Sequence, residues 1–74
     1  MAYRLRTFQG KVVRFFPAKA YGYVRLDAPS VLRAHFHLRD FDGVGADQIR
    51  EGSRLEFYLV DDPKGLRAAN VTLK

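Results

Sequence analysis

The sequence predicts an all-β domain, and two observations favour it. Short segments rich in β-branched and aromatic residues recur along the chain, and clusters of Gly, Pro, Asp and Ser separate them. Five short strands joined by tight turns favour a closed or nearly closed antiparallel barrel, because closure removes unpaired strand edges. The expected strands are residues 8–16, 20–26, 31–37, 55–60 and 66–73.

The breaks between these segments have recognisable turn chemistry. Pro17 ends the first segment because it cannot donate to a strand ladder, and residues 27–30 and 61–65 each combine Asp with Pro. Residues 42–45 hold two glycines, which permit a loop with positive φ. Residues 46–51 are too short for more than one turn of helix.

Length and composition limit the classes of protein. Seventy-four residues predict one domain spanning residues 1–74, with a hydrophobic core as its main stabilising element. There is no cysteine, which excludes disulfides and cysteine-based zinc sites. No signal peptide or membrane span is visible, so we expect a cytoplasmic protein without membrane association.

Basic and aromatic residues are concentrated in the first part of the chain. Residues 1–41 hold eight Lys and Arg against two Asp, whereas residues 42–74 hold five basic and six acidic residues. Eight of the ten aromatic residues also lie in residues 1–41. Cations hold a phosphate backbone and ring faces stack bases, so the combination favours binding of single-stranded nucleic acid. The alternative is that the basic residues solvate one face while the rings fill the core.

Alternation along the strands sorts the side chains. Tyr21 and Tyr23 share a face, and Val24 and Leu26 are the better core candidates on the other. A hairpin through residues 27–30 then sets Tyr21, Tyr23, His35 and Arg33 side by side as a stacking platform. Core residues are expected at Leu55, Phe57, Leu59 and Val71.

Five segments, in order, resemble the cold-shock domain family. They are Gly10-Lys11-Val12-Val13-Arg14-Phe15-Phe16, Lys19-Ala20-Tyr21-Gly22-Tyr23-Val24, Ala34-His35-Phe36, Glu51-Gly52 with Leu55-Glu56-Phe57, and Lys64-Gly65 with Ala68-Ala69-Asn70-Val71. The second resembles the family's Lys-Gly-Phe-Gly-Phe-Ile motif, and the third the end of Val-Phe-Val-His-Phe. The likeness runs from about residue 10 to 72 and leaves residues 1–9 as an N-terminal extension, which either lengthens the first strand or forms a loose basic arm.

The resemblance implies a five-stranded oligonucleotide-binding (OB) barrel that binds single-stranded RNA and DNA with little sequence preference, as an RNA chaperone does. It implies that Phe15, Tyr21, Tyr23, His35 and Phe36 stack bases and that Lys19 and Lys64 neighbour phosphates. Alternation instead places Phe36 with core-facing Leu32 and Ala34; we expect it at the surface, and Phe15 half-buried.

Some residues depart from the family pattern. Arg14 and Arg33 stand where the family usually has tryptophan and phenylalanine, and Phe16 where it has asparagine. A guanidinium can lie on a base and also pair with phosphate, so we expect binding to depend more strongly on charge. The full set of expected nucleic-acid-binding residues is Lys11, Arg14, Phe15, Lys19, Tyr21, Tyr23, Arg33, His35, Phe36 and Lys64.

Other functions have less support in the sequence. His35 and His37 point the same way on a strand, but no third metal ligand accompanies them, so neither a metal nor another cofactor is expected. No acid, base and nucleophile form a coherent set, which disfavours an enzyme. The alternative hypothesis is a barrel, expected as a monomer, whose arginine-bearing face docks an acidic partner of the transcription or translation machinery.

Overall fold

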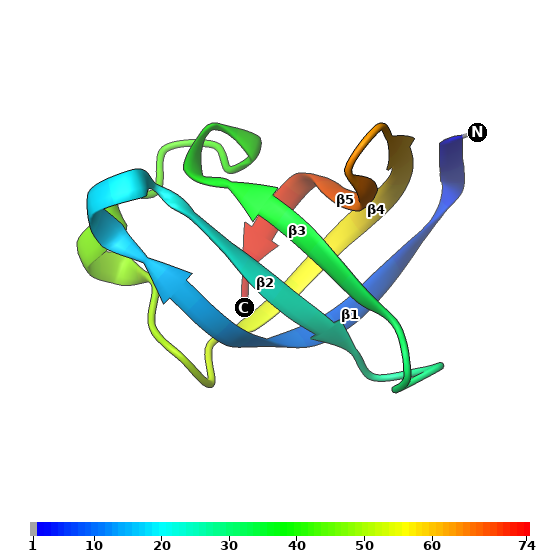
Figure 1. Cartoon of the computed structure of the whole chain (residues 1–74), viewed down its shortest axis with the longest axis horizontal. Coiled ribbons are helices and arrows are strands. Elements are labelled where there is room, and N and C mark those ends of the chain that lie inside the picture. The colour runs from blue at the N-terminus through cyan, green and yellow to red at the C-terminus, as the bar shows by residue number, and fades with distance from the viewer. Residues whose placement is uncertain (1) are drawn as a thin grey trace.

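A computed structural model describes residues 2–74, and the side chains of residues 6–74. Five strands form a closed barrel in the order β1-β2-β3-β5-β4, with β2 and β3 in front of β4 and β5 in the view of Figure 1. The strands are β1 (Ala2–Phe16), β2 (Tyr21–Leu26), β3 (Arg33–His37), β4 (Arg54–Asp62) and β5 (Gly65–Leu73). The predicted all-β five-stranded barrel is confirmed.

Four of the five strand pairings are antiparallel, as expected, but β3 and β5 run parallel. The reason is geometric: strand direction cannot alternate all the way round a closed ring with an odd number of strands. One parallel pair is therefore required. This pair brings His35 of β3 opposite Arg67 of β5.

Strand β1 is much longer than expected because the backbone of residues 2–7 continues it. Its first part pairs with β4 and its last part pairs with β2. The strand β1 therefore joins β2 and β4 in the closed barrel. Of the two alternatives for the N-terminal extension, residues 2–9 thus follow the first, a longer first strand.

Three single turns of 3-10 helix join the strands: η1 (Pro17–Lys19), η2 (Leu38–Asp40) and η3 (Ala46–Gln48). Only η3 was expected. The expected turn at residues 27–30 connects β2 to β3, and the turn at residues 61–65 connects β4 to β5. Within residues 2–74 no helix is long and apolar enough to cross a membrane.

The barrel interior is filled by side chains from all five strands, mostly at every second residue along a strand. Val24, Leu26, Leu55, Phe57, Leu59 and Val71 are buried, as alternation predicts. The remaining buried hydrophobic residues are Val12, Ala34, Phe36, Phe41, Ile49 and Ala68.

Gly22 leaves space inside the barrel for the ring of a residue on the neighbouring strand. It pairs with Phe15 on one side and with Phe36 on the other. A Cβ atom built on Gly22 would lie 2.3 Å from the carbonyl oxygen of Arg14 and 2.9 Å from the Phe36 ring. The missing side chain therefore makes room for the Phe36 ring inside the barrel.

An ion pair ties the end of β2 to the start of β4. Asp27 Oδ1 accepts a hydrogen bond from Arg54 Nη1 at 2.9 Å, and Oδ2 accepts from Nη2. These hydrogen bonds, with a smaller contribution from the charge of Arg54, hold the pKa of Asp27 below its usual value of 3.8.

The lowered pKa of Asp27 predicts an acid-dependent contribution to stability. A carboxylate with a depressed folded pKa stabilises the fold above its unfolded pKa, and this contribution is lost as pH falls through the folded pKa. We expect Asp27→Asn to lower the thermal midpoint slightly at pH 7 and to reduce its fall between pH 5 and pH 2. Thermal unfolding at these three pH values, followed by circular dichroism, measures both effects. An identical acid profile in wild type and variant would contradict the prediction.

Candidate nucleic-acid interface

A β-bulge in β1 determines which residues face outward. Val12 pairs with Val24 inside the barrel, and after a register shift Arg14 pairs with Tyr23. Strict alternation would place Arg14 on the same face as buried Val12. The extra residue, Val13, restores Arg14 to the outer surface and points Phe15 inward.

The outer surface of β1, β2 and β3 consequently carries three cross-strand rows. The ring row holds Phe16, Tyr21 and His37, and the middle row holds Arg14, Tyr23 and His35. The cation row holds Lys11, Arg25 and Arg33.

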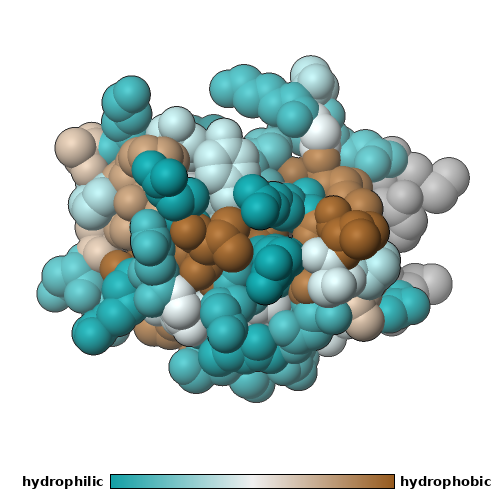
Figure 2. All heavy atoms as spheres, turned by 60° about the horizontal axis from the view of Figure 1, so that its bottom comes forward, coloured by the Kyte–Doolittle hydropathy of each residue, from teal (hydrophilic) through white to brown (hydrophobic). Residues whose placement is uncertain are grey.

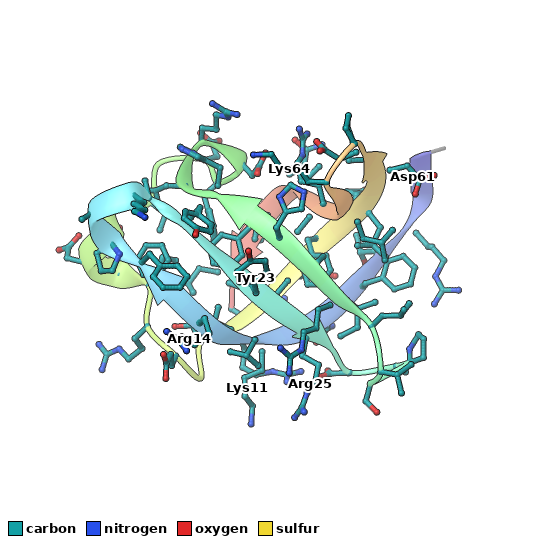
Figure 3. All side chains as sticks on the ribbon, in the orientation of Figure 1. Lys11, Arg14, Tyr23, Arg25, Asp61 and Lys64 are labelled. Atoms are coloured by element: carbon teal, nitrogen blue, oxygen red, sulfur yellow. The ribbon has the colours of Figure 1, made fainter. Side chains whose placement is uncertain are left out.

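Aromatic rings are in contact along and between the first two rows. The ring centroids of Phe16 and Tyr21 are 5.1 Å apart at 30°, and those of Tyr21 and Tyr23 are 6.0 Å apart at 79°. Tyr23 is 39% exposed, and it lies over the centre of the sheet in Figure 3. This surface offers accessible ring faces in fixed positions, as base stacking requires.

Arg14 extends this ring surface. Its guanidinium carbon lies 5.2 Å from the centroid of the Phe16 ring, and its Nε is 3.7 Å from a carboxylate oxygen of Glu51. The side chain remains 62% exposed. A planar guanidinium held in this way can stack on a base while keeping its charge available to a phosphate.

A groove of about 490 Å³ lies beside the tyrosines. Five of the predicted residues contribute to its lining: Tyr21, Tyr23, His35, Phe36 and Lys64. Lys64 comes from the β4–β5 turn, and in Figure 3 it lies on the other side of β3 from Tyr23. The remaining lining residues are His37, Arg39, Asp40, Asp62 and Arg67.

Ionisable side chains form a chain along one wall of this groove. His35 Nε2 is 3.8 Å from Asp62, and Arg67 lies 3.9 Å from Asp62 and 3.8 Å from Asp40. These separations are too long for hydrogen bonds. His35 Nε2 and Arg67 Nε are buried and have no hydrogen-bond partner among the described residues. Because Arg67 Nε always carries a proton, the groove wall contains a buried donor that has no hydrogen-bond partner among the described residues.

The hairpin that was predicted to assemble the platform is confirmed, since Tyr21 pairs with His37 and Tyr23 pairs with His35. Arg33 belongs to the cation row, and Phe15 is half-buried, as expected. Lys19 is exposed at the end of η1 and does not line the groove. The role of each predicted residue in binding remains a prediction.

The expectation that Phe36 lies at the surface is wrong. Phe36 is 1% exposed, and its ring stacks on Phe15 with centroids 6.0 Å apart and meets Phe41 edge to face at 5.6 Å. Phe36 pairs with Gly22 of β2. Because Gly22 has no side chain, the Phe36 ring can pack against the backbone of β2 inside the barrel. Phe36 therefore forms the floor of the groove and belongs to the core, as alternation indicates.

Several groove residues were not among the candidates. His37 could have been found, since it shares a strand face with His35 and pairs with Tyr21 once the hairpin is assumed. Arg67 enters through the parallel β3–β5 pairing, and no local sequence signal marks that pairing. Phe16 does not line the groove, but it too was not a candidate, and it faces outward only because of the bulge at Val13.

The whole of this surface lies in a segment with known relatives. Residues 8–74 match the family of the 'cold-shock' DNA-binding domain. The chain belongs to the cold-shock domain family. It is 38% identical over 63 residues to the major cold shock protein of Micrococcus luteus, covering 85% of this chain and 92% of that protein. It is 36% identical over 66 residues to a cold shock-like protein of Aquifex aeolicus, covering 88% and 91%.

Family membership and the barrel agree on function. Cold-shock domains bind single-stranded nucleic acid and act as RNA chaperones, and this is the function of the present chain. Cold-shock domain proteins are binding proteins, not enzymes. Among the described residues no group of three or more His, Cys, Asp and Glu is placed to hold a metal ion.

Proposed function

We propose that the outer surface of β1, β2 and β3 binds single-stranded RNA or DNA by stacking bases on Tyr21 and Tyr23. The observation that carries this proposal is the contact of these two rings on an open face, beside a groove that Lys64 also lines. Each base stacked on an aromatic side chain contributes about 1–3 kcal/mol. His35 and Arg67 supply polar contacts at the groove wall, and Arg14 adds a charged plane next to Phe16.

The same surface supports a chaperone mechanism without catalysis. Bases can stack on the tyrosines only when they are unpaired, so binding shifts the equilibrium of a weak duplex toward its open form. No cofactor or energy source is needed. We place this activity in a cytoplasmic, monomeric protein that acts as a single domain over residues 1–74.

Titration of fluorescently labelled hexauridylate at two salt concentrations tests the proposal. We expect clearly tighter binding to the single strand than to a self-complementary duplex of the same length. The logarithm of the affinity should fall with the logarithm of salt concentration by about 0.7 for each phosphate contact. Equal binding of single strand and duplex would contradict the proposal and favour docking of an acidic protein.

A further inference from the structure

The cation row is an unusual arrangement in a β-sheet. Lys11 of β1 is the direct cross-strand partner of Arg25 of β2, and Arg25 is in turn the partner of Arg33 of β3. All three side chains are exposed on the same outer surface. Like charges placed directly opposite each other destabilise a sheet, so this row costs stability in the free protein.

Acidic residues of the chain offset the charge of the row only in part: Asp27 attracts Lys11, whose charge helps to lower the pKa of Asp27. None of its three members forms an ion pair or hydrogen bond with a residue in the described part of the chain. Asp27, two residues after Arg25, already has both carboxylate oxygens bonded to Arg54. The three cations are thus available to an anion from outside the protein.

The row continues the stacking surface in one direction. Arg25 follows Tyr23 by two residues on β2, a distance of about 6.8 Å along an extended strand. In Figure 3, Lys11 and Arg25 lie together on one side of Tyr23, and Lys64 lies on the other. Figure 2, in which the lower edge of the barrel comes forward, shows a mainly hydrophilic surface with separate hydrophobic patches. The cation row itself contains no ring on which a base could stack.

We propose that the cation row is a phosphate-binding site for the nucleotides that flank the stacked ones, which lengthens the footprint of the same strand beyond the groove. The inference rests on the proposed stacking of bases on Tyr21 and Tyr23. Guanidinium groups bind phosphate oxygens through paired hydrogen bonds, and Lys11 adds a point charge. A nucleic-acid strand is favoured over an acidic protein because the row directly adjoins the stacking tyrosines.

The test compares charge-matched variants. Arg25→Gln/Arg33→Gln removes two cations from the row, and Arg6→Gln/Lys74→Gln removes two exposed cations from elsewhere. Arg6 lies over Phe8 in the part of β1 that precedes the β2 pairing, and Lys74 pairs with Glu56 of β4. Both variants have the same net charge, so a difference between them reports position. Binding of oligouridylates of four and ten nucleotides is measured between 50 and 200 mM salt.

For the decanucleotide we expect Arg25→Gln/Arg33→Gln to reduce the magnitude of the log–log salt slope by about 1.4, because two phosphate contacts are lost. Wild type and Arg6→Gln/Lys74→Gln should bind the decanucleotide more tightly than the tetranucleotide by similar factors. In Arg25→Gln/Arg33→Gln this factor should be smaller. Its thermal midpoint should equal or exceed that of wild type, which separates the binding effect from unfolding. Equal salt slopes and equal length gains in the two double variants would overturn the inference. If Tyr23→Ala still loses binding in that case, the proposed stacking on the tyrosines stands and only the phosphate-binding role of the cation row is rejected.

Discussion

Replacing Tyr23 by alanine is expected to weaken the binding of hexauridylate by about 5- to 150-fold, since a stacked base contributes about 1–3 kcal/mol. The ring lies over the middle of the sheet and is 39% exposed, so its removal deletes a stacking face without opening the core. Tyr21→Ala should have a loss in the same range. Because the two rings touch at 6.0 Å, the double variant need not show the sum of the two losses. Fluorescence titration of each variant gives the ratios of dissociation constants.

Two control variants distinguish stacking from general damage. Tyr23→Phe keeps the ring and should retain most of the affinity. Tyr58 is a half-buried tyrosine on β4, paired with Ala69 of β5, away from the proposed surface. Tyr58→Ala should therefore leave hexauridylate binding close to that of wild type. An equal loss in Tyr58→Ala and Tyr23→Ala would show that the tyrosines act through stability and not through stacking.

The parts of the fold that could be predicted are those fixed by local signals. Pro17 and the Asp-Pro turns end strands, and alternation separates Tyr21 and Tyr23 from Val24 and Leu26. These signals suffice for the β2–β3 hairpin and for the pairing of Tyr23 with His35. The core positions of β4 follow from the same alternation.

The parts that could not be predicted depend on contacts between distant strands. Closure of five strands makes β3 and β5 parallel, and only that pairing brings Arg67 to His35. The bulge at Val13 reverses the facing of Arg14, Phe15 and Phe16, and no residue in that strand marks it in the sequence. The cation row also needs the register of both pairings, because Lys11, Arg25 and Arg33 lie far apart in the chain.

Phe36 shows how the two kinds of information can conflict. The resemblance to the cold-shock family places it among stacking residues, whereas alternation with Leu32 and Ala34 places it inside. Alternation holds because Gly22 leaves a space that the Phe36 ring fills. The rings of Phe15 and Phe41 then enclose it.

Phe36→Ala is accordingly expected to cost about 3–5 kcal/mol of unfolding free energy, since it empties a fully buried ring site. Domains of this size have a total stability of similar order, so a large fraction of the variant should be unfolded at room temperature. Urea unfolding followed by circular dichroism measures the change. A surface ring would give a much smaller loss of stability.

Phe36→Leu keeps the test decisive if the alanine variant does not fold. Leucine retains much of the buried volume, so this variant should fold with a reduced urea midpoint. Once folded, it should bind hexauridylate within about twofold of wild type, because Phe36 supports the groove from below while Tyr21 and Tyr23 supply the accessible rings. If folded Phe36→Leu protein loses as much affinity as Tyr23→Ala, Phe36 is instead a stacking residue that becomes exposed when the nucleic acid binds.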